Sequence, residues 1–177
     1  ATPVFVDITH DTWLINAGEI NEKVTDKTKA IIGVDLYGNL VDWGEIADNI
    51  PNRLKAYCIS DAAESFGVFA GQNHEPFCKC YSFNGNKTIT AGGGGLLTSK
   101  YYDLSTYRAL SQKAKAENGT YFDVGYNYRM TNLSAGILLA QLQRVEDLLE
   151  KKRKINEIYQ NELEGYIKFQ RVRCDMV

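Results

Sequence analysis

The feature that most constrains the fold is an alternation of short apolar runs with segments of helical spacing. Residues 4–8 and 30–36 are rich in β-branched and other apolar residues, as strands are. Between them, residues 17–24 place Ile20 and Val24 four positions apart, which is the spacing of an inward helix face. A strand, a helix and a second strand in this order predict a β-α-β unit with neighbouring parallel strands.

The alternation continues beyond this unit. Asp42 and Glu45 form the cap-x-x-Glu pattern of a helix start. That helix should end before Pro51, with Ile46 and Ile50 facing inward. Further elements are predicted as strands at 55–59, 80–83 and 95–98 and a helix at 102–114. We therefore predict an α/β fold, a mostly parallel sheet covered by helices on both faces.

The last part of the chain is a long stretch without proline that has helical apolar spacing. Residues 133–165 are expected to form one long helix, whose charged run at 150–154 we interpret as a solvated face. Such a helix commonly leads into a second domain, so residues 166–177 should begin a small carboxyl-terminal domain. Residues 1–132 would then be the large domain. Because residues 1–8 read as the interior of a strand, we expect the chain to be a fragment.

Composition argues against several classes of function. The 177 residues include 20 basic and 22 acidic ones, for a formal net charge of −2. Neither sign forms a block typical of binding to nucleic acid or a membrane surface, and no stretch approaches the ~20 apolar residues of a membrane span. Cys58, Cys78, Cys80 and Cys174 lack the spacing of a metal site or a disulfide framework. We expect a cytoplasmic protein with reduced thiols, no metal, and no nucleic-acid or membrane partner.

Two chemically reactive side chains follow predicted strands. Asp61 comes just past the strand at 55–59, and open α/β sheets hold their ligands at such carboxyl ends. Lys87 lies between the strand at 80–83 and the glycine run 92–95. That run lacks both a Gly-Lys-Ser/Thr end and a Gly-x-Gly-x-x-Gly fingerprint, so we interpret it as a tight turn behind the lysine. Taken alone, Lys87 would be a solvated charge and Asp61 a helix cap.

Three motifs become specific when they occur together. They are Asp-Ala-Ala-Glu at 61–64, Ser-Phe-Asn-x-x-Lys at 82–87 and Gly-x-Asn-x-Arg-Met at 125–130. In these motifs the chain resembles the DegT/DnrJ/EryC1/StrS family, the sugar aminotransferases of fold type I. The resemblance spans almost the whole chain. It implies that residues 1–132 are the domain that binds pyridoxal phosphate (PLP), with its amino-terminal part missing.

The resemblance implies a role for each polar residue of the first two motifs. Lys87 would carry PLP as a Schiff base and then move the proton between substrate and cofactor. Asp61 would keep the pyridinium nitrogen protonated, so that the ring can take up the charge of a carbanion. Ala63 would let the ring lie flat above it, Glu64 would lie near the phenolic oxygen, and Ser82 would donate its hydroxyl to the phosphate.

The third motif implies a partner subunit. In the family this segment reaches the neighbouring subunit's site, so Asn127 would contact the partner's cofactor phosphate in a homodimer, supported by Arg129. Asn132 is expected to cap the helix that follows. Tyr37 and Arg129 are placed on the substrate side. Tyr37 belongs to a Val-Asp-Leu-Tyr-Gly run that resembles the family's Val-His-Leu-Tyr-Gly, and Asp35 stands where histidine is common.

The resemblance therefore implies a PLP-dependent aminotransferase that converts the keto group of a nucleotide-linked deoxysugar to an amine. The expected substrate is a UDP-, GDP- or dTDP-4-keto-6-deoxyhexose, the expected donor is L-glutamate, and the product would serve surface polysaccharide or glycoconjugate synthesis. A sugar dehydratase on the same scaffold is an alternative, but that branch has histidine in place of the lysine. A catalytically silent regulatory relative would lose Lys87 or Asp61 first, and a plain nucleotide-binding module would need neither.

Overall fold

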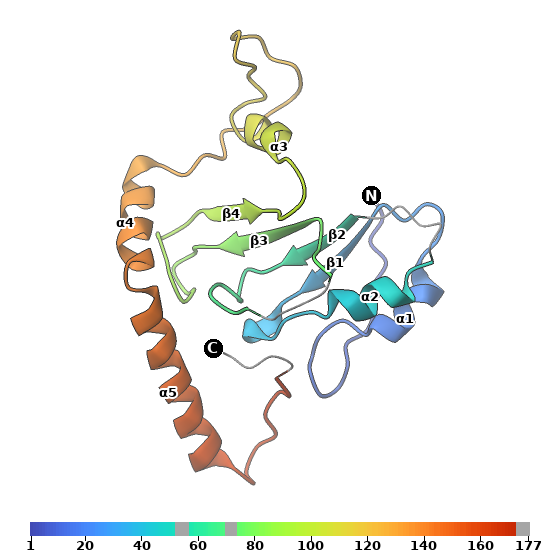
Figure 1. Cartoon of the computed structure of the whole chain (residues 1–177), viewed down its shortest axis with the longest axis vertical. Helices are drawn as coiled ribbons and strands as arrows, with labels where there is room; N and C mark the ends of the chain where they lie inside the picture. The colour runs from blue at the N-terminus through green and yellow to red at the C-terminus, as the bar shows by residue number, and fades with distance from the viewer. Residues whose placement is uncertain (52–56, 70–73, 173–177) are drawn as a thin grey trace.

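The computed structural model describes residues 1–51, 57–69 and 74–172. Within these ranges the centre is a four-stranded sheet with the strands in chain order (Figure 1). The strands are β1 (Ala30–Val34), β2 (Tyr57–Asp61), β3 (Cys78–Ser82) and β4 (Gly95–Thr98). β1, β2 and β3 run parallel, and β4 is antiparallel to β3. The predicted α/β fold, a mostly parallel sheet flanked by helices, is confirmed.

Two short helices cover one face of this sheet beside β1. α1 (Ala17–Lys23) is capped by Asn16 and α2 (Trp43–Asn49) by Asp42, and each cap side chain accepts a hydrogen bond from a main-chain amide of the first turn. The helix start predicted at Asp42 is therefore confirmed. The buried side chains of these helices share one core with β1. This core consists of Leu14, Ala17, Ile20, Ile31, Val41, Trp43 and Ile46.

Burial alternates along β1, as expected for a strand with one covered face. Ile31 and Gly33 are buried, whereas Ile32 and Val34 are exposed on the opposite face. A Cβ added to Gly33 would lie 3.1 Å from the Trp43 ring, so glycine allows the helix to approach closely. The helical cover that we expected on the second face of β1 is not found among the described residues.

The chain before α1 differs from the prediction. No strand forms over residues 4–8, and Ile8 makes only a single antiparallel bridge, to Ile15. Val4 and Phe5 are 65% and 85% exposed. A strand needs a neighbour for its main-chain amides and carbonyls, and this run has none in the described sheet. Apolar composition alone was therefore insufficient to predict a strand.

The other predicted strands are present with shifted ends. The strands expected at 80–83 and 95–98 are β3 and β4. The strand expected at 55–59 is β2, displaced toward the carboxyl end, and residues 52–56 lie outside the described part of the chain. Asp61 is consequently the last residue of β2 and not the first one beyond it.

The helix predicted over 102–114 is shorter than expected. α3 spans Ser105–Leu110. Lys113 and Ala114 have φ angles of 68° and 51°, in the left-handed region that a right-handed helix excludes. α3 therefore cannot continue to residue 114. After Leu110 the chain forms a projecting segment, residues 111–131, which we call the arm (Figure 1).

The helical stretch at the carboxyl end is two helices in place of the single one expected. They are α4 (Asn132–Leu142) and α5 (Val145–Leu163). Between them Arg144 has φ −119° and ψ 14°, and its amide bonds to the Gln141 carbonyl at 3.1 Å in a tighter turn. The bend allows both helices to contact the same core under Lys87. The packed side chains are Leu138, Val145 and Leu148.

The amino-terminal cap of α4 is Thr131, and the prediction of Asn132 was wrong by one residue. Thr131 Oγ1 accepts a hydrogen bond from the Ser134 amide at 3.2 Å, and Asn132 is the first helical residue. Both residue types cap helices well, so composition could not separate them. The extended conformation of Thr131, φ −70° and ψ 154°, decides where the helix begins.

Beyond α5 the chain returns to the loop before α1. The Arg171 amide donates to the Asp11 carbonyl at 2.8 Å, and Lys168 Nζ lies 2.8 Å from Asp11 Oδ1. This segment is the beginning of the stretch at 166–177 that we expected to start a second domain, and residues 173–177 lie outside the described part. In the residues that are described, it packs on the loop before α1.

Candidate active site

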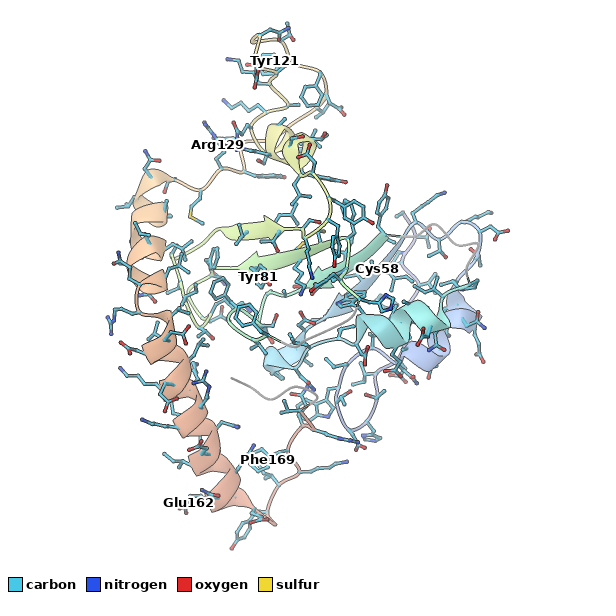
Figure 2. The ribbon with its side chains drawn as sticks, in the orientation of Figure 1. Cys58, Tyr81, Tyr121, Arg129, Glu162 and Phe169 are labelled. Atoms are coloured by element: carbon cyan, nitrogen blue, oxygen red, sulfur yellow. The ribbon has the colours of Figure 1, made fainter. Side chains whose placement is uncertain are left out.

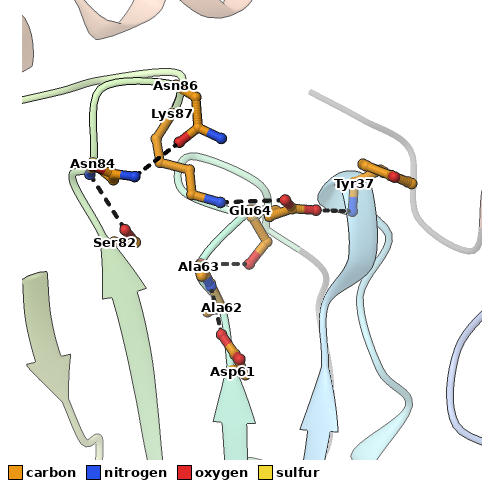
Figure 3. A network of polar contacts seen from close by, with 10 residues as sticks. Tyr37, Asp61, Ala62, Ala63, Glu64, Ser82, Asn84, Asn86 and Lys87 are labelled. Atoms are coloured by element: carbon orange, nitrogen blue, oxygen red, sulfur yellow. Dashed lines mark hydrogen bonds and ion pairs between the residues drawn. The ribbon is translucent and has the colours of Figure 1, made fainter.

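The carboxyl ends of β2 and β3 bring together the polar residues of the first two motifs (Figure 3). Asp61 pairs with Cys80 across the two parallel strands, and Ser82 lies two residues further along β3. Because side chains alternate along a strand, Asp61 and Ser82 lie on the same face of the sheet. Ser82 Oγ accepts a hydrogen bond from the Asn84 amide at 3.3 Å, which starts the loop that carries Lys87.

Lys87 and Glu64 form an ion pair at the centre of the site. Lys87 Nζ donates to Glu64 Oε1 at 3.2 Å, and Glu64 Oε2 accepts from the Tyr37 amide at 3.1 Å (Figure 3). The two side chains are 18% and 31% exposed, so water screens this pair less than it screens a surface pair. Glu64 thereby joins the turn after β2, the lysine loop and the 3-10 turn η1 (Leu36–Gly38).

The turn after β2 is built on the side chain of Asp61. Its Oδ1 accepts a hydrogen bond from the Ala63 amide at 3.1 Å, as in an Asx turn. The Ala62 amide donates to the Cys80 carbonyl at 2.9 Å, and the Ser65 amide donates to the Ala62 carbonyl at 3.2 Å. These bonds fix the Asp61 carboxylate and the half-buried Ala63 as one unit.

Main-chain hydrogen bonds close the loop that carries Lys87 at its base. The Phe83 amide donates to the Gly94 carbonyl, and the Phe83 carbonyl accepts from the Ala91 amide, both at 3.0 Å. Under the loop, Phe83, Ile89 and Ala91 are 2%, 0% and 5% exposed and form a core with α4 and α5. Lys87 therefore extends from a loop whose base and underside are both fixed.

The glycine run behind the loop is the tight turn that the sequence predicted. Gly92 and Gly94 have φ angles of 76° and 95°, which other residues rarely adopt. A Cβ added to Gly95 would lie 2.7 Å from the Tyr81 carbonyl oxygen. The glycines thus permit a close return of the chain into β4.

A buried carboxylate lies beneath the site, on the α1–α2 side of the sheet. Asp35 is 3% exposed. Its Oδ2 accepts from Ser60 Oγ at 2.8 Å and from Ser65 Oγ at 3.1 Å, and its Oδ1 accepts from the Val41 amide at 2.9 Å. Burial raises the pKa of Asp35, and these hydrogen bonds act in the opposite direction. The sequence singled out Asp35 only as a departure from histidine; the apolar run before it was a usable signal of burial.

Only the main chain of Tyr37 joins the Lys87 network. Tyr37 is 67% exposed, and its ring meets the Trp13 ring edge-on, with centroids 6.4 Å apart. Tyr37 and Trp13 have φ angles of 55° and 57°, which are uncommon for residues other than glycine and concentrate at functional sites. Sequence reasoning missed Trp13, because residue type does not reveal a strained backbone.

The third motif lies outside the network drawn in Figure 3. Asn127 and Arg129 are exposed on the arm, where Asn127 bridges Gln112, and Figure 2 places Arg129 beside α3. Gly125 explains the close crossing within the arm, since a Cβ there would lie 2.2 Å from the Ala114 amide nitrogen. The structure therefore brings the first two motifs together around Lys87, whereas Asn127 and Arg129 lie apart from Lys87.

The reactive groups that meet at this sheet edge are an amine, two carboxylates and a hydroxyl. Among the residues that the structure describes, no group of three or more His, Cys, Asp or Glu side chains could hold a metal. In the same ranges, no helix has the length and apolar character needed to cross a membrane. Cys58, Cys78 and Cys80 are free thiols, and burial raises the pKa of Cys78 to about 11.

This fold and site define an α/β protein with a polar, lysine-centred site at the carboxyl edge of its sheet. A model of the DegT/DnrJ/EryC1/StrS aminotransferase family matches residues 1–176, and the chain belongs to this family. GDP-perosamine synthase of Escherichia coli O157:H7 is 38% identical over 184 residues, which cover 99% of this chain and 50% of that protein. The chain spans about half the length of the curated relatives it matches.

Solved structures share the fold. A DegT DnrJ EryC1 StrS aminotransferase from Brucella abortus has a TM-score of 0.85 at 28% identity, over 98% of this chain and 50% of that one. A GDP-4-keto-6-deoxy-D-mannose-3-dehydratase from E. coli, solved with bound hydrated PLP, has a TM-score of 0.76 at 25% identity, over 92% and 47% of the two chains. The resemblance predicted from the three motifs is confirmed.

Proposed function

We propose that this chain is part of a PLP-dependent aminotransferase that converts the keto group of a nucleotide-linked deoxysugar to an amine. The observation that carries the proposal is the pairing of Lys87 with Glu64, at 3.2 Å, beside Asp61 at the carboxyl ends of two parallel strands. The relative named GDP-perosamine synthase supports a GDP-linked sugar within that class. Lys87 favours the aminotransferase over a dehydratase on the same scaffold.

The residues present fit the cofactor. PLP offers an aldehyde that a lysine amine captures, a ring nitrogen that a carboxylate keeps protonated, and a phosphate that takes hydroxyl donors. Lys87, Asp61 and Ser82 supply these groups, and the last two share one face of the sheet. When bound, PLP delocalises the negative charge that forms on the substrate carbon next to the amine. The small side chain of Ala63, held beside the Asp61 carboxylate, leaves space for a flat ring.

Lys87 would first hold the cofactor and then act as the acid and base. The incoming amine would displace it, and its Nζ would then move the proton between the substrate carbon and the cofactor. The loop limits how far Nζ can travel, because Phe83 fixes its base with two main-chain bonds. Attachment of the cofactor to Lys87 would free Glu64 from the ion pair, so that Glu64 could contact the phenolic oxygen through a shared proton.

Asp61 would hold the proton on the ring nitrogen. A carboxylate that accepts a hydrogen bond from a charged N–H forms one of the stronger hydrogen bonds in proteins. The Ala63 amide, at 3.1 Å from Oδ1, fixes the rotamer of Asp61 before any ligand arrives. Such preorganisation spares the site the cost of orienting the carboxylate during the reaction.

We further propose that Asn127 and Arg129 act in a neighbouring subunit of a homodimer. The arm exposes an apolar surface that a second copy could bury. Its exposed members are Tyr121, Phe122, Val124, Tyr126 and Tyr128. The rings of Tyr126 and Tyr128, on either side of Asn127, stack with centroids 5.1 Å apart, which stiffens this part of the arm. A two-fold axis would bring each arm to the partner's site and complete both sites equally.

The remaining parts of the proposal follow from the same assignment. Residues 1–132 would form the cofactor-binding domain, 133–165 the link, and 166–177 the start of a small domain. L-glutamate is the proposed donor, surface polysaccharide or glycoconjugate synthesis the proposed pathway class, and the cytoplasm the proposed location. The free thiols of Cys58, Cys78 and Cys80 support a reducing compartment. Tyr37, on the exposed rim beside Glu64, is proposed to face the sugar.

The covalent attachment is tested directly on the full-length protein. Borohydride treatment after incubation with PLP should fix the cofactor on the protein, and mass spectrometry of a tryptic digest should find the phosphopyridoxyl group on the peptide that contains Lys87. Attachment to a different lysine would contradict the assignment of Lys87. The absence of any labelled peptide would contradict the aminotransferase itself.

A further inference from the structure

Asp35 contacts both ends of the Asp-Ala-Ala-Glu motif from below. Its Oδ2 accepts from the hydroxyl of Ser60, the residue before Asp61, at 2.8 Å. The same oxygen accepts from the hydroxyl of Ser65, the residue after Glu64, at 3.1 Å. The Asp35 amide also donates to the Asp61 carbonyl at 2.9 Å. One carboxylate oxygen therefore bridges the start and the end of the turn that presents the cofactor-facing groups.

The same side chain fixes a second segment that contacts Glu64. Asp35 Oδ1 accepts from the Val41 amide at 2.9 Å and so closes the loop that contains Tyr37. The Tyr37 amide in turn donates to Glu64 Oε2 at 3.1 Å. Asp35 is thus linked to Glu64 by two routes, one through Ser65 and one through the loop of Tyr37.

Burial of the Asp35 carboxylate costs free energy that its hydrogen bonds must offset. Asp35, Ser60 and Ser65 are 3%, 0% and 2% exposed, and a buried carboxylate is tolerated only when hydrogen bonds compensate for its lost hydration. Lys79, a cation that acts on Asp35 across this face, is itself 2.9 Å from Glu75 and so shares its charge with a second carboxylate. Two hydroxyls and an amide therefore provide the direct contacts that hold Asp35 in place.

We propose that Asp35 is a positioning residue that sets the place of Glu64, and through it the contact with the phenolic oxygen of the cofactor, by holding Ser65. The inference rests on the proposed function, because it concerns the residue that faces PLP. Asp35 itself does not reach that side: it bonds to Ser60, whose side chain points to the opposite face of β2 from Asp61.

Ser65→Ala and Ser60→Ala form the pair of variants for the test. Each removes one hydroxyl donor from the same oxygen of Asp35, and both serines are buried. The Ser65 hydroxyl also lies 3.4 Å from the Ala62 carbonyl. Ser60 lies within β2, whose main chain β1 and β3 hold from both sides. Ser65 lies in a turn. Loss of the Ser65 hydroxyl should therefore release Glu64, whereas loss of the Ser60 hydroxyl should not.

The readouts are the visible absorbance of bound PLP as a function of pH and the PLP dissociation constant, both measured on the full-length protein. For Ser65→Ala and Asp35→Asn we expect the pH midpoint of the absorbance change to move by about one unit. The dissociation constant should rise roughly tenfold. For Ser60→Ala the midpoint should stay within about 0.3 unit and the dissociation constant within about twofold.

A double variant tests whether Asp35 and Ser65 act on Glu64 through the same contact or disturb the structure independently. Asp35→Asn combined with Ser65→Ala should move the midpoint no further than the larger single change, because both variants break the same link. Additive shifts, or equal shifts for Ser60→Ala and Ser65→Ala, would overturn the proposal while the function stands. If the unaltered protein binds no PLP, the proposed function fails and this inference with it. Should Asp35→Asn not fold, judged by circular dichroism, the serine pair decides alone.

Discussion

The lysine loop and the arm carry motifs of the same family, yet the chain holds them in different ways. Under the loop, Phe83 and Ile89 are 2% and 0% exposed, and two helices pack against them. On the arm, Val124 and Tyr128 are 76% and 72% exposed. The fold of a single chain therefore suffices to place Lys87 beside Glu64, whereas the position of Asn127 relative to any site depends on what the arm meets.

The largest effect is expected when the amine of Lys87 is removed from the loop. In Lys87→Ala, turnover should fall by about a thousandfold or more, since both the covalent hold on the cofactor and the acid and base are lost. Steady-state kinetics on the full-length protein measures this. Lys100→Ala, at an exposed position after β4, is the control and should keep normal turnover. Substantial activity in Lys87→Ala would remove the loop from the chemistry.

The second test concerns the carboxylate on which the turn is built. Asp61→Asn keeps the shape but removes the charge, and turnover should fall roughly a hundredfold to a thousandfold, as for other well-placed polar groups in dry sites. Asp103→Asn is the matched control, because Asp103 is exposed and bonds to Ser105 in its own turn. Near-normal turnover in Asp61→Asn would make this carboxylate structural.

Substitutions under the lysine loop and on the arm should change the free energy of unfolding by different amounts. Ile89→Ala empties a fully buried position and should lower the free energy of unfolding by about 3 kcal/mol. Val124→Ala on the arm, which removes a smaller and mostly exposed side chain, should change it by less than about 0.5 kcal/mol in the monomer. Urea unfolding monitored by fluorescence gives both values. Equal losses would mean that the arm is packed in solution as firmly as the loop.

The smallest expected effect is the activity recovered in a mixed dimer, which tests the role of the arm. Two inactive full-length variants, Lys87→Ala and Asn127→Asp, are mixed and allowed to exchange subunits. In a mixed dimer one site has both defects and the other has neither, so this species should regain about half of normal activity. Native mass spectrometry verifies the exchange, and each variant alone provides the baseline. With exchange verified and no recovery, Asn127 must act in its own subunit.

The sequence predicted the parts of the molecule that depend on local pattern. The apolar, β-branched run at 30–36 predicted β1, and the cap-x-x-Glu pattern predicted the start of α2 at Asp42. What it missed depends on tertiary contacts. The bend at Arg144 follows from packing on the core under the lysine loop, and the missing strand at 4–8 follows from the lack of a neighbouring strand.

For the candidate site too, the sequence predicted some features and missed those that depend on tertiary contacts. The resemblance carried by the motifs predicted that Lys87, Asp61 and Ser82 belong to one site. The motifs could not predict that Glu64 pairs with Lys87 or accepts from the Tyr37 amide, since those contacts join segments that are distant in sequence. Nor does residue type reveal that Asp35 bridges a serine of β2 and a serine of the turn that follows it.

α5 links the core under the lysine loop to the segment that packs on the loop before α1. Its 19 residues form a rod of roughly 28 Å. Val145 and Leu148, in the first turn, rest on the core under Lys87, whereas Ile158 and Tyr159, toward the other end, are 59% and 57% exposed. Beyond that end the chain bonds to Asp11, through the Arg171 amide and Lys168 Nζ. α5 is therefore attached at both ends to the part of the chain that contains the sheet, and a change in its tilt would disturb either the core under Lys87 or the bonds to Asp11.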